Sequence, residues 1–299
     1  MKYRKLGKSD LMISRIGLGC MSIPASNEQL GVSIIHRAID LGINYFDTAD
    51  LYERGLNETI VGKGIQGNRA DVILATKVGN EWGQGVSGWK WNPHKEYIVK
   101  AVEDSLKRLK TDYIDLYQLH GGTIEDPIDE TIAAFELLVA QGKIRYYGIS
   151  SIRPNVIREY VKRSNIVSVM MQYSLADRRP EEEMLNMLFE NSIGVLARGS
   201  LAQGMLVNKT VKEYLGHSVE ELRKAAATVH ELTFDKRTAV QAAIRYVLEH
   251  RAVTAAVVGV SRLEQLEEIA GTSDLDPLDE EEIRLLMSSI PALKYEQHR

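Results

Sequence analysis

The stretch AVEDSLKRLKTDYIDLYQLH, residues 101–120, contains one complete unit of the pattern that decides the fold. Val102, Leu106 and Leu109 follow one another at helical spacing, so one face of the first half is apolar. The short apolar run at 114–118 is typical of a buried strand. A helix that leads directly into such a strand favours parallel strands joined by helical crossovers.

The same alternation recurs along most of the chain. Gly42, Gly142 and Gly194 each follow a helical stretch and precede a strand, where we expect a left-handed helix cap. Eight such units favour an α/β fold of the (β/α)8 TIM barrel type over an open, doubly wound sheet, with residues 1–299 as a single barrel domain. The eight expected strands are 16–19, 45–47, 72–76, 114–118, 146–149, 168–171, 194–197 and 255–258.

Three segments lie outside the repeat. Residues 3–6 and 12–13 flank a turn and predict an N-terminal β-hairpin that plugs one end of the barrel. The charged stretch 207–238 predicts a helical insertion packed outside the repeat. Asp279, with Glu282 three positions later, predicts the capping box of an appended C-terminal helix.

Composition excludes several classes of protein. With 37 basic and 41 acidic residues the net charge is −4, which argues against partners such as nucleic acid or an anionic membrane. A single cysteine excludes an intramolecular disulfide framework, and the seven histidines show no paired spacing for a metal. No signal peptide or membrane-spanning run is found, so we expect a cytoplasmic protein that acts on a small molecule.

Four ionisable side chains follow successive candidate strands: Asp47 with Tyr52, then Lys77, then His120. In a barrel these strand ends meet at one rim. A phenol has a pKa of about 10 and becomes a usable acid when a neighbouring ammonium stabilises its phenolate. Asp47 would keep Lys77 charged, and His120 would position a carbonyl oxygen. Each residue alone has an ordinary structural explanation, but the four together predict a catalytic site.

Several motifs carry a resemblance that covers essentially the whole chain. They are GINYFDTADLY (42–52), ILATK (73–77), LKTDYIDLYQLH (109–120), GKIRYYGIS (142–150) and the glutamine of MMQYS, Gln172. Together they resemble the aldo-keto reductase superfamily. The resemblance implies a barrel that binds a nicotinamide cofactor, with Asp47, Tyr52, Lys77 and His120 as the catalytic tetrad and Tyr52 as the general acid.

The resemblance also implies where the cofactor lies. Ser150, Ser151 and Gln172 would contact the nicotinamide carboxamide. The segment RGSLAQG (198–204) would wrap the pyrophosphate, and GVSRLEQLEE (259–268) would bind the adenosine end. Arg262 could pair with a 2′-phosphate, which favours NADP(H) over NAD(H). The expected cofactor contacts are Cys20, Met21, Ser150, Ser151, Gln172, Arg198, Gly199, Ser200, Leu201, Gln203, Gly204, Gly259, Ser261, Arg262, Gln265 and Glu268.

The chain departs from the family pattern at three positions. Ser151 stands where asparagine is common, and Arg198 stands where many members have an aromatic residue that stacks on nicotinamide. Ile269 replaces an asparagine that often contacts adenine, so Gln265 and Glu268 are the expected adenine contacts. The segment GLGCMS (17–22) lacks the third glycine of a Rossmann fingerprint, and we interpret it as the first strand and its loop.

The loop after Lys77 contains all three tryptophans, of which Trp82 and Trp89 are candidates for an apolar substrate wall; the alternative is that they cover the barrel mouth. We expect an NADP-dependent oxidoreductase that reduces aldehydes or ketones. The alternative is a nicotinamide-binding, redox-sensing or regulatory subunit with little turnover. A lyase or isomerase without nicotinamide is disfavoured by the adenosine-end motif.

Overall fold

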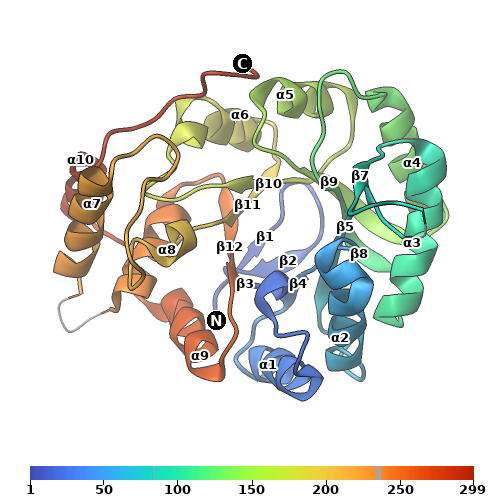
Figure 1. The fold of residues 1–299 in the computed structure, drawn as a ribbon, viewed down its shortest axis with the longest axis horizontal. Helices are drawn as coiled ribbons and strands as arrows, with labels where there is room; N and C mark the ends of the chain where they lie inside the picture. The colour runs from blue at the N-terminus through green and yellow to red at the C-terminus, as the bar shows by residue number, and fades with distance from the viewer. Residues whose placement is uncertain (84, 234–236) are drawn as a thin grey trace.

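The computed structural model describes residues 1–83, 85–233 and 237–299, and its centre is a closed barrel of eight parallel strands (Figure 1). Each strand pairs in parallel with the strand before and after it, and the last closes onto the first. The (β/α)8 TIM barrel prediction is therefore confirmed. The strands are β3 (Ile16–Gly19), β4 (Tyr45–Asp47), β5 (Ile73–Val78), β8 (Ile114–Leu119), β9 (Ile144–Ser150), β10 (Ser168–Gln172), β11 (Gly194–Arg198) and β12 (Val253–Gly259).

Helices surround the barrel on the outside (Figure 1). Two further helices, α7 and α10, pack side by side beyond this ring, and capping boxes begin both of them, at Ser218 and Asp279. The predicted C-terminal helix is therefore present. The helices of the described residues are α1 (Glu28–Asp40), α2 (Leu56–Gly64), α3 (Lys95–Leu109), α4 (Ile128–Ala140), α5 (Pro154–Arg163), α6 (Met184–Glu190), α7 (Val219–Glu231), α8 (Ala239–Glu249), α9 (Leu263–Gly271) and α10 (Glu280–Ser289).

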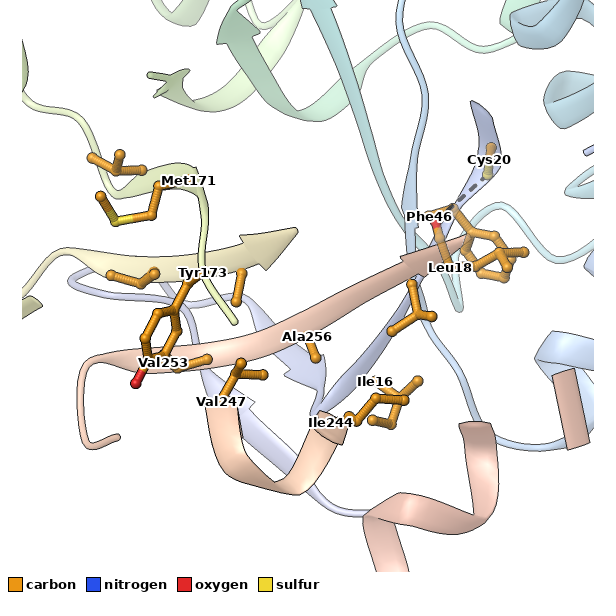
Figure 2. Packing of buried hydrophobic residues seen from close by; sticks show 14 of the residues in the cluster. Ile16, Leu18, Cys20, Phe46, Met171, Tyr173, Ile244, Val247, Val253 and Ala256 are labelled. Atoms are coloured by element: carbon orange, nitrogen blue, oxygen red, sulfur yellow. Dashed lines mark hydrogen bonds between the residues drawn. The ribbon is translucent and has the colours of Figure 1, made fainter. Parts of the chain in front are cut away.

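A core of apolar side chains fills the layer between the barrel and the helices (Figure 2). Ile16 and Leu18 of β3 point outward into this layer, and Ile244 and Val247 of α8 come from the opposite side. All four side chains are fully buried. Since burial of one such side chain stabilises the fold by about 1.5–3 kcal/mol, this layer holds the strands in a fixed frame.

The N-terminal hairpin closes one end of the barrel, as predicted. Its strands β1 (Tyr3–Lys5) and β2 (Met12–Ser14) are antiparallel. Leu6, Leu11 and Ile13 are buried in a cluster with inward-facing barrel residues. The hairpin fills the end at which the strands begin, which leaves the end at which they finish available for a site.

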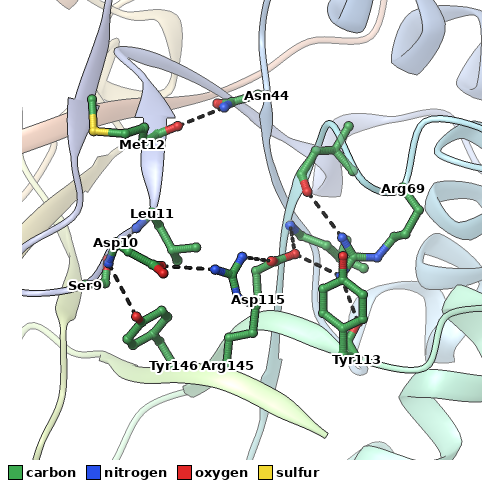
Figure 3. A network of polar contacts seen from close by, with 12 residues as sticks. Ser9, Asp10, Leu11, Met12, Asn44, Arg69, Tyr113, Asp115, Arg145 and Tyr146 are labelled. Carbon is green, nitrogen blue, oxygen red and sulfur yellow. Dashed lines mark hydrogen bonds and ion pairs between the residues drawn. The ribbon is translucent and has the colours of Figure 1, made fainter. Parts of the chain in front are cut away.

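Polar contacts hold the hairpin in place (Figure 3). Arg145 of β9 donates one hydrogen bond to Asp10 of the hairpin turn at 3.0 Å and one to Asp115 of β8 at 2.9 Å. Arg69 lies 2.8 Å from the second oxygen of Asp115. This end of the barrel therefore combines apolar packing with ion pairs and is a structural region.

The glycine prediction holds at two positions and is wrong at the third. Gly42 and Gly142 have φ values of 82° and 70°, in the left-handed region. At the third turn Ser192 has φ 55°, and Gly194 does not have a positive φ. Gly194 is required for space instead, because a Cβ there would lie 2.6 Å from Thr254 Oγ1.

The insertion predicted at 207–238 contains α7, but residues 234–236 lie outside the described part of the chain. Within the described part, no helix combines the length and apolar character needed to span a bilayer.

Candidate active site

The barrel interior changes character along the strands, because every second side chain points inward. Ile73 and Ala75 of β5, and Leu116 of β8, lie in the apolar cluster above the hairpin. Two positions further along their strands come Lys77 and Gln118, both buried. The side chains that line the barrel interior are thus apolar where the strands begin and polar where they finish.

Lys77 is the centre of the polar end. Its ammonium contacts Asp47, donates to the backbone oxygen of Thr48 at 2.8 Å and donates to the hydroxyl of Tyr52 at 3.2 Å. Only 1% of Lys77 is exposed. Burial lowers the pKa of Lys77, but the nearby Asp47 and Tyr52 outweigh burial, and the net pKa is raised. Lys77 is therefore an ammonium group held next to a phenol.

Two residues that the sequence analysis missed complete the environment of Asp47. Gln118 donates to Asp47 Oδ2 at 3.0 Å, and the hydroxyl of Tyr45 donates to the same oxygen at 3.4 Å. Both side chains are fully buried. The period of two along the strands could have identified both as inward-facing residues, since Tyr45 and Gln118 each precede a tetrad residue by two positions, but not their contact with Asp47.

Tyr52 and His120 form the partly exposed side of the site. Their rings meet edge to face at 82°, with centroids 5.8 Å apart. Tyr52 begins a short 3-10 helix, Tyr52–Gly55, in which Glu53 and Arg54 have positive φ values of 47° and 50°. The structure thus brings the four predicted catalytic side chains together on β4, β5, β8 and the turns that follow them.

The imidazole of His120 is neutral near neutral pH. Burial, together with the positive charges of Lys77 and Arg198, lowers the pKa of His120 to about 3. Its Nδ1 is buried and has no hydrogen-bond partner among the described residues. A neutral ring can donate one hydrogen bond and accept another without adding charge to the site.

Gln172 and Arg198 lie at the ends of neighbouring strands, β10 and β11, and are paired in register. Arg198 Nη1 donates to Gln172 Oε1 at 3.1 Å. The amide nitrogen of Gln172 donates to Asp177 Oδ2 at 2.9 Å and to the hydroxyl of Tyr214 at 3.1 Å. Asp177 and Tyr214 were not predicted, because both lie in irregular segments where no periodic pattern marks them.

The remaining nicotinamide and pyrophosphate candidates follow β9 and β11. Ser150 and Ser151 are buried, and Ser151 Oγ accepts a hydrogen bond from the backbone of Arg153 at 3.2 Å. In the segment 198–204, Ser200 is buried and Leu201 half-buried, whereas Gly199 and Gln203 are exposed. Gly199, Gln203 and Gly204 have positive φ values, so the chain folds back on itself after β11.

The adenosine-end candidates surround the start of α9. Gly259 ends β12, and Arg262 is the exposed N-cap residue of α9. Gln265 Oε1 accepts from the backbone nitrogen of Ser261 at 3.0 Å, and Glu268 is half-buried on the same helix. Ile269 is 2% exposed and belongs to the core. Its apolar nature is therefore explained by packing.

Cys20 and Met21 form a short 3-10 helix with Ser22 after β3. Met21 is 64% exposed, whereas Cys20 is completely buried. Burial, with the negative charge of Asp47, raises the pKa of the Cys20 thiol. Cys20 is consequently a thiol in the core and not a nucleophile.

The tryptophans of the loop after β5 have three different environments. Trp89 is exposed, and Trp82 is half-buried with the Arg108 guanidinium 5.6 Å from its ring centroid. Trp91, in the small hairpin of β6 (Asn80–Glu81) and β7 (Lys90–Trp91), donates to Asp126 at 3.0 Å. Residue 84 of this loop lies outside the described residues. Trp82 and Trp89 remain candidates for the substrate wall.

Comparisons with known proteins decide the family. The model of the Aldo/keto reductase family matches residues 15–290. The chain belongs to this family. As an aldo-keto reductase it is an NAD(P)H-dependent oxidoreductase, and such enzymes act on small carbonyl compounds.

Relatives of this aldo-keto reductase cover the whole chain. It is 54% identical to the "Uncharacterized oxidoreductase YqkF" of Bacillus subtilis (strain 168) over 308 residues, which cover 100% of both chains. Its structure resembles "aldo-keto reductase AKR11C1 from Bacillus halodurans (holo form)" with a TM-score of 0.94 and 51% identity, covering 100% of this chain and 99% of the other. An aldo/keto reductase from Klebsiella pneumoniae "in complex with NADP and acetate" is 28% identical with a TM-score of 0.81, covering 99% and 98% of the two chains.

Proposed function

We propose that this aldo-keto reductase is an NADP-dependent enzyme that reduces aldehydes or ketones to alcohols, with Tyr52 as the proton donor, within a single domain formed by residues 1–299. The observation that carries the proposal is the 3.2 Å hydrogen bond from the buried Lys77 ammonium to the Tyr52 hydroxyl. A cation in this place stabilises the phenolate that remains when the proton leaves.

The donor set fits a nicotinamide dinucleotide. The Ser200 hydroxyl is buried without a hydrogen-bond partner among the described residues, and His120 Nδ1 is in the same condition. Both atoms belong to residues expected to face the ligand, so each is available for a hydrogen bond to it. Gln172 and Arg198 would contact the nicotinamide end, Ser200 and its neighbours the pyrophosphate, and Arg262 the adenosine end. When bound, the cofactor supplies the hydride.

The chain's own residues handle the proton. Tyr52 donates its hydroxyl proton to the carbonyl oxygen, while Lys77 holds the resulting negative charge at a distance at which oppositely charged groups interact strongly. Asp47 keeps Lys77 protonated and fixes its position, since Lys77 is otherwise surrounded by the barrel core. His120, neutral and next to Tyr52, donates a hydrogen bond that orients the carbonyl oxygen.

Arg262 supports NADP over NAD. It is exposed at the N-terminus of α9, where backbone N–H groups also favour an anion. An arginine there can pair with a 2′-phosphate through two parallel hydrogen bonds. The related Klebsiella pneumoniae structure contains NADP.

Substitution of Tyr52 by phenylalanine tests the proposal. We expect Tyr52→Phe to lower kcat for a panel of aldehydes and ketones by at least about 100-fold, because the proton donor is lost. NADPH affinity, measured by fluorescence titration, should change little, and NADH titrated in parallel should bind more weakly than NADPH.

Tyr3→Phe is the matched control, because it removes a phenol hydroxyl that donates to Gly42 at the opposite, hairpin end of the barrel. It should leave kcat unchanged. Undiminished turnover by Tyr52→Phe would exclude Tyr52 as the acid, and a wild-type protein that binds NADPH but reduces none of the carbonyls would favour a regulatory subunit.

A further inference from the structure

The amide of Gln172 has a defined orientation in the structure. A carboxylate only accepts hydrogen bonds, so the group facing Asp177 must be the nitrogen, Nε2. A guanidinium only donates, so the group facing Arg198 must be the oxygen, Oε1. Tyr214 can donate or accept and does not discriminate between the two orientations.

Asp177 is the more constrained of these two partners. It is 1% exposed, whereas Arg198 is half-buried at the edge of the site. The backbone of Asp177 exchanges two hydrogen bonds with Ser174, at 3.0 and 3.3 Å, which close the turn after β10. Arg179 donates to both carboxylate oxygens at 2.7 Å. The Asp177 carboxylate, which accepts the hydrogen bond from Gln172, is thus held both by its own turn and by Arg179.

The C-terminal tail, residues 291–299, supports Arg179 in turn. The guanidinium of Arg179 lies 5.3 Å from the centroid of the Tyr295 ring, which is buried. The backbone nitrogen of Tyr295 donates to Glu182 at 3.3 Å, and Arg299 pairs with the same carboxylate at 2.6 Å. In Figure 1 this tail runs from α10 past α6 to α5, where His298 accepts a hydrogen bond from Asn155.

We propose that Asp177 is a positioning residue for the cofactor: it holds the Gln172 amide so that Oε1 faces the site and accepts a hydrogen bond from the N–H of the nicotinamide carboxamide, while the docked tail keeps Arg179 and Asp177 in place. An amide oxygen has two lone pairs, and Arg198 uses one of them. With the amide reversed, N–H groups would face both Arg198 and the carboxamide. This inference rests on the proposed function, since it requires a nicotinamide next to Gln172.

The test compares three ligands that differ at the nicotinamide end. NADPH has the carboxamide, its 3-acetylpyridine analogue has a carbonyl without the N–H, and adenosine 2′,5′-bisphosphate lacks this end entirely. We expect Asp177→Leu to weaken NADPH binding by roughly tenfold, the effect of one lost hydrogen bond. Its affinities for the analogue and for the bisphosphate should equal those of the wild type.

A second variant guards against misfolding. In Asp177→Leu the charge of Arg179 loses its partner, whereas the double variant Asp177→Leu/Arg179→Met removes both charges, which is less costly to stability. The matched control is Glu181→Gln, which removes a nearby carboxylate that contacts Tyr173 and Arg178 and makes no contact with Gln172. It should bind all three ligands like the wild type.

The outcomes distinguish failure of the positioning role of Asp177 from failure of the proposed function. Selective weakening of NADPH binding in both Asp177 variants supports the positioning role. Equal weakening for NADPH and the bisphosphate means that Asp177 is only structural, and unchanged NADPH affinity means that it does not position Gln172; either result overturns the inference and leaves the proposed function intact. A wild-type protein that fails to bind NADPH overturns both.

Discussion

Two buried aspartates, Asp115 and Asp47, lie at opposite ends of the same barrel and are held by different cations. Asp115 contacts Arg69 and Arg145 and accepts a backbone hydrogen bond from Leu74 at 3.0 Å. Asp47 contacts Lys77. Both oxygens of Asp115 are occupied by arginines, one of which, Arg145, also contacts Asp10 of the hairpin turn. Arginine keeps its proton in proteins, so neither cation passes a proton on, and we call this the closed network.

The network of Asp47 has an open end. Lys77 uses one of its three N–H groups for Asp47, one for the backbone of Thr48 and one for Tyr52, whose ring is partly exposed at the mouth of the barrel. A buried ion pair alone therefore indicates structure as readily as function. What distinguishes the site is that the cation continues to a group that can exchange a proton with a ligand.

The largest effect is expected at the open network. Lys77→Met should lower kcat by roughly 10²–10⁴-fold, because nothing then stabilises the phenolate. It should also lower the free energy of unfolding by about 3–5 kcal/mol, because Asp47 stays buried without a cation. Steady-state NADPH oxidation and urea unfolding measure the two effects.

The double variant Lys77→Met/Asp47→Asn separates the effect on kcat from the effect on stability, since it removes both charges. It should recover most of the lost stability and none of the lost activity. If Lys77→Met keeps more than a tenth of wild-type kcat, Lys77 does not support proton transfer, and the Asp47 network differs from the Asp115 network in position alone.

The closed network should show the opposite behaviour. Asp115→Asn should reduce the free energy of unfolding by about 3 kcal/mol, because Arg69 loses its carboxylate partner in a mostly buried place. Per folded molecule, kcat should equal that of the wild type. Asp10→Asn, which removes the exposed partner of Arg145, is the control and should change stability by less than about 0.5 kcal/mol. Loss of activity in a stably folded Asp115→Asn protein would contradict the assignment.

A third aspartate sharpens the comparison because it has no ion pair among the described residues. Asp50 is 2% exposed, its Oδ1 has no partner in the described part of the chain, and its Oδ2 accepts a long hydrogen bond from Tyr97, at 3.5 Å. Burial, with the negative charge of Glu58, raises the pKa of Asp50 to about 8. Asp50 therefore holds a proton at neutral pH in the folded protein.

The unfolded chain releases that proton near pH 4, so this group makes folding less favourable as pH rises from about 4 to 8. Asp50→Asn imitates the protonated form. Relative to the wild type, it should gain about 2–3 kcal/mol in free energy of unfolding between pH 5 and pH 7, because each pH unit between the two pKa values contributes about 1.4 kcal/mol, and the gain should level off above pH 8. Urea unfolding of both proteins across this range measures it, and a difference that does not vary with pH would contradict the assignment.

Local sequence was sufficient for much of the fold. All eight expected strands were located to within about two residues at each end, because buried parallel strands are short apolar runs bounded by helix caps. The third cap shows the limit of local reasoning. Ser192 takes the left-handed conformation, whereas Gly194 is needed because Thr254 of another strand lies too close to it for any side chain.

The roles assigned to individual site residues stay predictions, but their convergence in space was predictable. Asp47, Lys77 and His120 follow consecutive strands, and parallel strands finish at the same end of a barrel. Sequence alone could not reveal that Gln118 contacts Asp47, since the two are separated by 71 positions and the pairing depends on how neighbouring strands align.

The sequence by itself determined which residue types stand at the strand ends, because alternation along a strand and capping of a helix act over a few residues. Only the tertiary structure decided how those groups are connected: that Lys77 contacts the Tyr52 phenol, that Asp115 contacts two arginines, and that the tail lies against Arg179. These contacts arise when barrel closure and helix packing bring distant segments together, and no local pattern encodes the distances between them.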